Sequence, residues 1–228
     1  MDLTGIGLYT FQEASKLTGV PARDLRRWLD GYAYRRKGDR GTVPVRPLWE
    51  PELSRAEIDG ISFHDLLEVR FVRAFRQHGV SLQTIRLASE KARQQFSLPY
   101  PFTSRRFQTD GRTIFASAVH ETGEIELLDL IKGQYAFQKI IEPSLYQGID
   151  FGPDDTALRW YPSPGNTAVV LDPQIAFGKP IVTEGQVRTS ILYASYLAEN
   201  DRHFVANLHE VPLSAVGAAI DFEERLAA

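Results

Sequence analysis

The 228-residue sequence contains no cysteine. This absence excludes disulfide bonds, thiolate metal sites, cysteine nucleophiles and thiol redox sensing. Long apolar runs are missing as well: crossing a membrane takes about 18 or more consecutive apolar residues, and no such run occurs. The opening residues, MDLTGIGLYT, also lack the basic and apolar regions of a secretory signal. We therefore expect a cytoplasmic protein without a membrane partner.

Motifs for catalysis are also scarce. No HExxH zinc motif occurs, and the five histidines are dispersed along the sequence. Gly178-Lys179 is followed by Pro180, where a phosphate-binding loop carries serine or threonine. We predict no enzymatic activity, no cofactor and no metal site.

Charge is distributed unevenly along the chain. Residues 1–112 hold 19 Lys and Arg against 13 Asp and Glu, whereas residues 113–228 hold 7 against 16. The two halves therefore have net charges of +6 and −9, although the formal net charge of the whole chain is only −3. Because a basic surface attracts nucleic acid and an acidic surface repels it, the two halves are predicted to bind different partners.

Two short helices are predicted near the N-terminus. Thr10 and Glu13 have the spacing of a capping box, and Gly19 is placed to end the first helix, at about 11–18. Pro21 suits the first position of a second helix that extends to about residue 30. Two short helices joined by a glycine-containing turn are typical of a helix-turn-helix.

The second helix and the segment after it carry the candidate DNA contacts. On the helix, an apolar stripe lies opposite three arginines, which a solvated surface helix would also explain. The following segment, YAYRRKGDRGTVPVRPLW at 32–49, predicts a basic β-wing that turns at Gly38-Asp39. The candidate DNA-binding residues are Arg23, Arg26, Arg27, Tyr34, Arg35, Arg36, Lys37, Arg40 and Arg46.

Downstream of the wing, the periodicity changes twice. Helical spacing persists to about residue 95, and FSLPYPF at 96–102 breaks it. The next stretch alternates and is rich in turn signals, with a hairpin predicted at Asp110-Gly111 and a turn before a further strand at Thr122-Gly123. A strand-like run from 167 then leads to three predicted helices, near 188–198, 201–209 and 213–226.

These patterns predict an α+β protein in three segments. Residues 1–96 form a winged helix-turn-helix domain, and residues 97–166 form a β-rich connecting segment. Residues 167–228 form a small three-helix domain.

Two segments resemble a known family of DNA-binding domains. LYTFQEASKLTGVPARDLRRW and FVRAFRQHGVSLQTIRLA resemble the MerR-type winged helix, over about residues 8–95. The resemblance implies a recognition helix in the major groove that carries Arg23, Arg26 and Arg27, and a wing that contacts DNA through residues 35–40. MerR regulators continue into a long dimerisation helix, and the sequence departs from that pattern at 96–102.

The C-terminal stretch resembles a small antitoxin-associated domain that accompanies PIN-like ribonuclease toxins. The resemblance covers about 168–225 and rests on Gly178-Lys179-Pro180, Arg188-Thr189-Ser190 and the helix from Leu213 to Ile220. At 184–186 the chain has Glu-Gly-Gln where that family usually carries Gly-Thr-Arg, so no role of the family arginine is carried over.

Together the two resemblances imply a VapB-type antitoxin of a type II toxin-antitoxin system. Such a protein would bind double-stranded operator DNA as a homodimer, repress its own operon and neutralise a PIN-like ribonuclease toxin. The alternative is a MerR-like transcription regulator that responds to a small molecule, for which Tyr135, Phe137, Trp160 and Tyr161 are candidate pocket residues. Neither resemblance specifies which residues touch the toxin.

Overall fold

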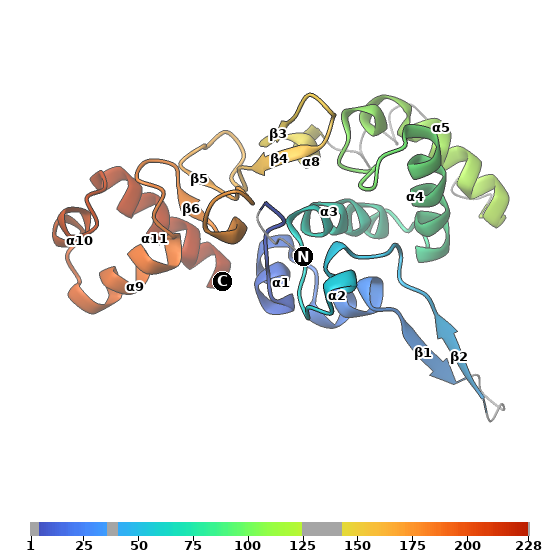
Figure 1. Cartoon of the computed structure of the whole chain (residues 1–228), viewed down its shortest axis with the longest axis horizontal. Coiled ribbons are helices and arrows are strands. Elements are labelled where there is room, and N and C mark those ends of the chain that lie inside the picture. The colour runs from blue at the N-terminus through green and yellow to red at the C-terminus, as the bar shows by residue number, and fades with distance from the viewer. Residues whose placement is uncertain (1–4, 36–40, 125–142, 228) are drawn as a thin grey trace. The chain divides into compact units, whose positions relative to one another are not determined.

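The computed structural model describes residues 5–35, 41–124 and 143–227, and its chain divides into two compact units (Figure 1). The N-terminal unit spans Thr10–Tyr146, and the C-terminal unit combines Met1–Tyr9 with Gln147–Ala228. This grouping differs from the three segments proposed from the sequence. It differs because the chain after residue 96 packs on the helix before it, whereas Trp160 pairs with Leu171 beyond the proposed boundary at 166.

The N-terminal unit begins with the first helix of the predicted helix-turn-helix, α1 (Phe11–Thr18). The Thr10 hydroxyl accepts a hydrogen bond from the Glu13 backbone N–H at 3.2 Å, and the Glu13 carboxylate accepts one from the Thr10 N–H at 2.7 Å. This reciprocal pair is the predicted capping box. Gly19 ends the helix in the left-handed conformation, with φ of 67°.

The second helix, α2 (Ala22–Leu29), leads directly into the wing. Gly31 makes the turn with φ of 76°, and a Cβ there would lie 2.5 Å from the Val45 carbonyl oxygen, so a side chain would clash with the backbone. The wing is antiparallel, with β1 (Tyr32–Arg35) paired to β2 (Thr42–Val45). The turn predicted at Gly38-Asp39 lies outside the described residues.

A short 3-10 helix, η1 (Glu52–Ala56), precedes two longer helices, α3 (Phe63–Gln77) and α4 (Leu82–Phe96). The α4 helix ends where the sequence predicts a break. Ser97 follows it in the left-handed conformation, with φ of 56°, and two prolines come within the next four residues. The helical pattern therefore stops at residue 96, as predicted.

The hairpin predicted at Asp110-Gly111 is wrong, because this segment is the helix α5 (Arg105–Thr122). Gly111 lies in the helix interior, where a Cβ would approach the Phe107 ring to 2.9 Å. The buried residues follow helical rather than strand spacing, and Gly123 is the left-handed C-cap. The strand predicted after Gly123 falls on residues outside the described part of the chain. The buried residues of the helix are Phe107, Gly111, Ile114, Phe115, Ala118 and Val119.

An aromatic cluster forms the centre of the N-terminal unit. The Phe75 ring centroid on α3 lies 5.3 Å from that of Phe102 and 4.4 Å from that of Phe115 on α5. Tyr146, in the short helix α8 (Pro143–Tyr146), donates a hydrogen bond to the Phe102 carbonyl at 2.9 Å. The segment after α4 is thus fixed to α3 by ring packing and to α8 by a buried hydrogen bond.

The C-terminal unit contains two short antiparallel hairpins, β3 (Ile149–Phe151) with β4 (Ala157–Trp160), and β5 (Val169–Val170) with β6 (Ile181–Val182). The 3-10 turn η2 (Ala176–Gly178) lies between β5 and β6. The start of the chain joins this unit, because Leu8 N–H donates to the Phe177 carbonyl at 2.9 Å and the Tyr9 hydroxyl donates to the Gly178 carbonyl.

The chain ends in the three predicted helices, α9 (Thr189–Glu199), α10 (Arg202–Leu208) and α11 (Leu213–Ala227). Asp201 caps α10 as predicted, accepting hydrogen bonds from the backbone N–H groups of His203 and Phe204. With the hairpins, these helices give the α+β class predicted from the sequence. None of the helices in the described part of the chain combines the length and apolar character that crossing a membrane requires. The core of the bundle includes Val182, Leu192, Val205, Val216, Ala219 and Ile220.

Candidate nucleic-acid interface

The two faces of α2 are as predicted. Its apolar face is buried, whereas Arg23 and Arg26 are exposed and Arg27 is half-buried on the other side. Helical periodicity produces this arrangement, because residues three and four apart share a face. The helix therefore presents guanidinium groups on the side opposite its core contacts. The buried residues are Leu25, Trp28 and Leu29.

On α2, the Arg26 side chain is held in place by two carboxylates. Its Nη1 and Nη2 donate to the two Asp59 carboxylate oxygens at 3.0 and 3.1 Å, and Nη1 lies 3.6 Å from Asp30 Oδ2. Its guanidinium also lies 4.1 Å from the centroid of the Phe11 ring. The hydrogen bonds from Arg26 lower the pKa of Asp59. Asp59 was not expected at this site, because it is far from Arg26 in the sequence.

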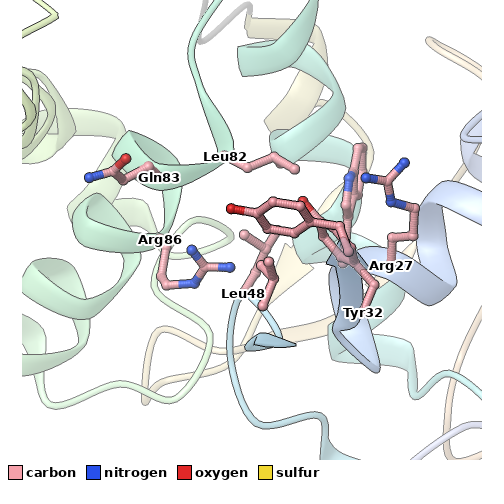
Figure 2. A pocket seen from close by; sticks show the side chains of 9 residues that line it. Arg27, Tyr32, Leu48, Leu82, Gln83 and Arg86 are labelled. Atoms are coloured by element: carbon pink, nitrogen blue, oxygen red, sulfur yellow. The ribbon is translucent and has the colours of Figure 1, made fainter. Parts of the chain in front are cut away.

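Arg27 and the wing tyrosines border a groove of about 480 Å³ between α2, the wing and the start of α4 (Figure 2). The Arg27 guanidinium lies 4.2 Å from the Tyr32 ring centroid. Tyr34 is two residues further along β1 and is 42% exposed. The groove therefore has aromatic walls with a cation at its edge. Its lining residues are Arg27, Trp28, Tyr32, Tyr34, Val45, Leu48, Leu82, Gln83 and Arg86.

Arg86 ties the end of the wing to α4. Its Nε donates to the Pro47 carbonyl at 3.2 Å, and its Nη2 donates to the Arg46 carbonyl at 2.8 Å. Sequence reasoning did not include Arg86 or Gln83 among the candidate contacts. A signal was nevertheless present, since these two polar residues are three apart in a helical pattern and so share a face. In the structure they flank the buried Thr84 and Ile85.

The structure describes part of the predicted wing surface. Arg35 is exposed on β1, opposite Thr42, and Arg46 is exposed just after β2. Arg36, Lys37 and Arg40 lie outside the described residues. Of the described basic residues of α2 and of the wing, Arg27 lines the groove, and the others belong to the same unit.

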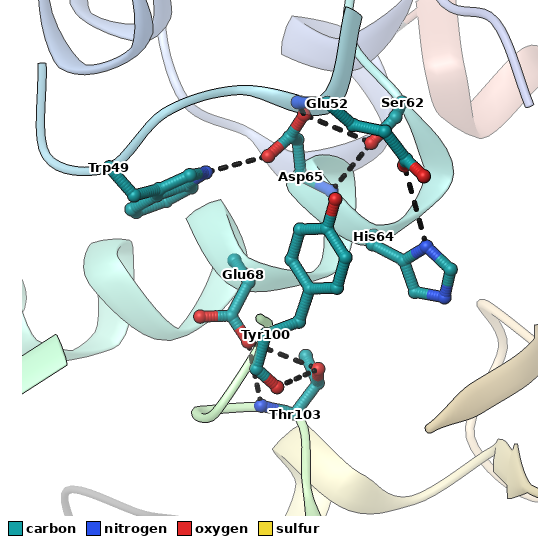
Figure 3. A network of polar contacts seen from close by, with 8 residues as sticks. All are labelled: Trp49, Glu52, Ser62, His64, Asp65, Glu68, Tyr100 and Thr103. Atoms are coloured by element: carbon teal, nitrogen blue, oxygen red, sulfur yellow. Dashed lines mark hydrogen bonds and ion pairs between the residues drawn. The ribbon is translucent and has the colours of Figure 1, made fainter. Parts of the chain in front are cut away.

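A buried carboxylate anchors the segment that follows the wing (Figure 3). Asp65 on α3 accepts hydrogen bonds from Trp49 Nε1 at 2.6 Å, from the Glu52 N–H at 3.0 Å and from the Ser62 hydroxyl at 3.0 Å. Burial raises the pKa of Asp65, and these hydrogen bonds act in the opposite direction. Three donors on one carboxylate fix the wing base against α3.

One turn further along α3, Glu68 is fully buried (Figure 3). Its Oε1 accepts from both the N–H and the hydroxyl of Thr103, at 2.9 and 3.0 Å. Burial raises the pKa of Glu68 to about 7, although the hydrogen bonds from Thr103 and the nearby charge of Arg93 lower it. Glu68 therefore joins α3 to the segment before α5.

The third member of this network is an ion pair at its edge. His64 Nδ1 lies 3.5 Å from Glu52 Oε2, and the His64 ring stacks on Tyr100 with centroids 4.6 Å apart. Burial raises the pKa of Glu52, but its interactions with His64, Ser62 and Tyr100 outweigh burial and hold that pKa below its usual value. These contacts join the segment after the wing to α3 and to the segment before α5.

The structure places the residues proposed for a small-molecule pocket as follows. Trp160 is 4% exposed, and its backbone pairs with Ile149 and Leu171 inside the C-terminal unit. Tyr161 is half-buried, and Tyr135 and Phe137 lie outside the described residues. Within the described ranges, no three His, Asp or Glu side chains gather in a way that could hold a metal ion.

Comparisons with known proteins match the same regions. A family described as "Putative DNA-binding HTH domain" matches residues 7–89. "Putative antitoxin VapB45" of Mycobacterium tuberculosis is 32% identical over 198 residues, which cover 81% of this chain and 80% of that protein. "Uncharacterized protein Rv2308" of the same organism is 28% identical over 100 residues, covering 43% of this chain and 39% of that protein.

A solved structure is also similar. The crystal structure of Rv2018 from Mycobacterium tuberculosis matches with a TM-score of 0.67 and 26% identity, covering 96% of this chain and 100% of that chain. The family match covers α1, α2, the wing, α3 and half of α4, and so includes every residue that lines the groove. These findings support a helix-turn-helix domain at the basic surface of the N-terminal unit.

Proposed function

Because the chain belongs to the family of the Mycobacterium tuberculosis protein named "Putative antitoxin VapB45", we propose that it is a toxin-antitoxin repressor that neutralises a PIN-like ribonuclease. The N-terminal unit binds the operator of its own operon, and the C-terminal unit binds the toxin. The observation that carries the DNA part is the exposed arginine face of α2 beside a basic wing, within the residues matched by a DNA-binding family.

In this proposal α2 enters the major groove of operator DNA. Arg23 and Arg27 read base edges, since a guanidinium can donate two hydrogen bonds to guanine O6 and N7. Arg35 and Arg46 contact phosphates and so fix the register of the protein on the duplex. The Tyr34 hydroxyl is exposed on β1 and serves as a further phosphate donor.

The protein binds as a homodimer in this proposal. Helix-turn-helix dimers contact two half-sites about 34–36 Å apart, so that two recognition helices reach successive major grooves. Because α4 ends at Phe96, the dimer interface differs from the long helix of MerR regulators.

The DNA part is tested by binding at fixed salt to the duplex upstream of the protein's own gene and to a random duplex. We expect at least about a thousandfold tighter binding to the cognate duplex, as is usual for specific DNA-binding proteins. Fluorescence anisotropy would measure both affinities. Equal affinities would show a non-specific polyanion contact and contradict operator recognition.

The toxin part is tested by co-expressing the tagged full chain with the adjacent reading frame. We expect a ribonuclease to copurify and to stay inactive until the complex is dissociated. The matched control is the same ribonuclease expressed without this chain, which should degrade RNA. If the neighbouring protein is expressed and folded yet forms no complex, the antitoxin function is wrong.

A further inference from the structure

The helix α9 is apolar on the side that faces away from its own bundle. Its sequence, TSILYASYLAE, contains no charged residue before Glu199. Leu192 is buried against the core, with Tyr193 and Tyr196 packed beside it. The side opposite Leu192 carries exposed apolar side chains and the hydroxyl of Ser190, and no charged group, although a surface helix normally carries charged residues there.

The outward face of α9 is defined by four residues at helical spacing: Ile191, Ala194, Leu197 and Ala198. All four are exposed, Ile191 to 45% and Leu197 to 64%. The same bundle exposes Phe204 and Leu208, one turn apart on α10. Clustered exposed apolar side chains of this size mark interaction sites on soluble proteins.

The charge of the helical bundle favours a different protein over a second copy of this chain as the occupant of this face. Residues 189–227 hold two arginines and six carboxylates, so the bundle is acidic. Two copies meeting through α9 would bring like charges together, which disfavours self-association. A protein partner with a basic rim around an apolar patch would gain both apolar burial and charge complementarity.

We infer that the toxin docks on the outward face of α9. The toxin makes this contact through an apolar patch of its own, which is bordered by basic side chains. This inference rests on the proposed antitoxin function and identifies the toxin-binding residues within it. Ile191 and Leu197 are the anchors, because they are the large side chains of the face. The net negative charge of the bundle speeds association and makes the affinity fall as salt rises.

The test changes both anchors to glutamate in the full chain, as Ile191→Glu with Leu197→Glu. The probe is the purified product of the adjacent reading frame, and titration calorimetry measures its affinity. The matched control is Leu158→Glu on β4, whose side chain is as exposed as Ile191, at 45%. We expect the double variant to bind the probe about 30-fold or more weakly, and the control to bind within about threefold of the unchanged chain.

Two further measurements keep the result interpretable. Circular dichroism melting should be unchanged, because both anchors are exposed, and operator affinity should be unchanged, because it depends on the other unit. The affinity of the unchanged chain for the probe should fall between low and high salt. Together with the loss of binding, these results would support docking on α9.

The contrary outcomes separate the two proposals. If the unchanged chain does not bind the probe, the antitoxin function itself fails. If the unchanged chain and the double variant bind the probe equally, the function stands and the α9 surface is wrong. If the double variant keeps its affinity for the probe but sediments as a smaller species than the unchanged chain, α9 is covered by a second copy and the inference is overturned.

Discussion

The two units differ in which apolar side chains they bury. In the N-terminal unit, phenylalanines from α3, α5 and the segment between α4 and α5 fill a fully buried cluster. In the C-terminal unit the core is small and mostly aliphatic. Among the described residues, Tyr34 is the large hydrophobic exposed by the N-terminal unit. The C-terminal unit exposes Leu158, Phe177, Ile191, Leu197, Phe204, Leu208 and Leu213.

The same contrast holds for charge. The N-terminal unit exposes arginines on α2 and on the wing, and it holds the buried carboxylates of Asp65 and Glu68 in hydrogen-bond networks. The helical end of the C-terminal unit is acidic in composition and exposes apolar side chains on α9. A surface for a polyanion needs cations on a rigid support, whereas a surface for a protein needs apolar area that water leaves on binding. The two units therefore expose surfaces of different chemistry, one rich in arginine and the other apolar and acidic.

The largest expected effect is on the free energy of unfolding, when a buried rather than an exposed apolar side chain is removed. Phe75→Ala should lower the free energy of unfolding by about 3–5 kcal/mol, because it empties the centre of the aromatic cluster. Leu197→Ala should change that free energy by less than about 0.5 kcal/mol, because the side chain is mostly exposed. Urea denaturation followed by circular dichroism would measure both. A similar cost for the two variants would show that the outward face of α9 is part of a core.

A pH titration tests the buried carboxylates of the N-terminal unit. The folded-state pKa of Glu68 is raised from 4.5 to about 7, so the folded protein binds this proton more tightly than the unfolded chain. The free energy of unfolding should therefore fall as pH rises from 4.5 to about 7. Glu68→Gln keeps an acceptor for both Thr103 donors and should remove this decline. At pH 8 the variant should be more stable on the order of 1–3 kcal/mol.

Glu52 provides the matched control for that titration. Its folded-state pKa is lowered, so its carboxylate contributes stability above its ordinary pKa, and this contribution is lost as pH falls. Glu52→Gln should accordingly be less stable than the unchanged chain at pH 8, the opposite sign to Glu68→Gln. Thermal melts across pH 4 to 9 would compare the three proteins. The same sign for both variants would contradict the assignment of burial as the dominant cause at Glu68.

Base recognition by α2 should depend on Arg27. Arg27→Ala should weaken binding to the operator by about 1–3 kcal/mol and binding to random DNA much less, if the guanidinium reads a base. Arg26→Ala is the comparison, because Asp59 and Asp30 hold that arginine in the free protein. Fluorescence anisotropy on both duplexes separates the two contributions. An equal loss on both sequences would assign Arg27 to the phosphate backbone.

Phosphate contacts by the wing predict a change in salt dependence. Removing one phosphate contact, by Arg35→Ala or Arg46→Ala, should reduce the slope of log K against log salt by about 0.9. Random and operator DNA should show the same reduction, because phosphate contacts carry no sequence information. Lys179→Ala in the C-terminal unit is the control and should leave the slope unchanged. A constant slope in the wing variants would exclude the wing from the interface.

The smallest expected effect concerns the carboxylate that holds Arg26. Asp59→Asn removes the ion pair and one negative charge beside α2. Operator affinity should rise by less than about tenfold, since exposed ion pairs are weak. The measurement is the same anisotropy titration, with Glu57→Gln as a control for the loss of one nearby charge. A fall in affinity specific to Asp59→Asn would show that the carboxylate positions Arg26 for DNA binding.

Local signals in the sequence were sufficient for the elements of the DNA-binding surface. The capping box at Thr10, the left-handed Gly19 and the apolar stripe of α2 act within a few residues, so each could be recognised without a partner segment. The same holds for the wing strands and the three C-terminal helices. The exposed side of α2 follows from helical periodicity alone.

The wrong prediction of a hairpin shows that local sequence signals do not determine every segment. Asp110-Gly111 has the composition of a hairpin turn, yet Gly111 lies inside α5, where a Cβ would meet the Phe107 ring one turn earlier at 2.9 Å. The helix packs against α4, and its Phe115 ring lies against Phe75, about forty residues earlier in the chain. A short-range signal loses to such packing because burying aromatic rings stabilises the fold more than the favoured turn does.

The amino-acid sequence by itself determined the two helices of the helix-turn-helix, the three C-terminal helices, the strands of the wing and the separation of positive from negative charge, because these depend on neighbours along the chain. Only the tertiary structure decided that Asp59 holds Arg26, that Arg86 ties the wing to α4 and that Asp65 anchors the wing base. The tertiary structure also decided which face of α9 is exposed, because the exposed and the buried face both carry apolar residues. Which apolar side is covered depends on three-dimensional packing, and helical periodicity alone does not specify it.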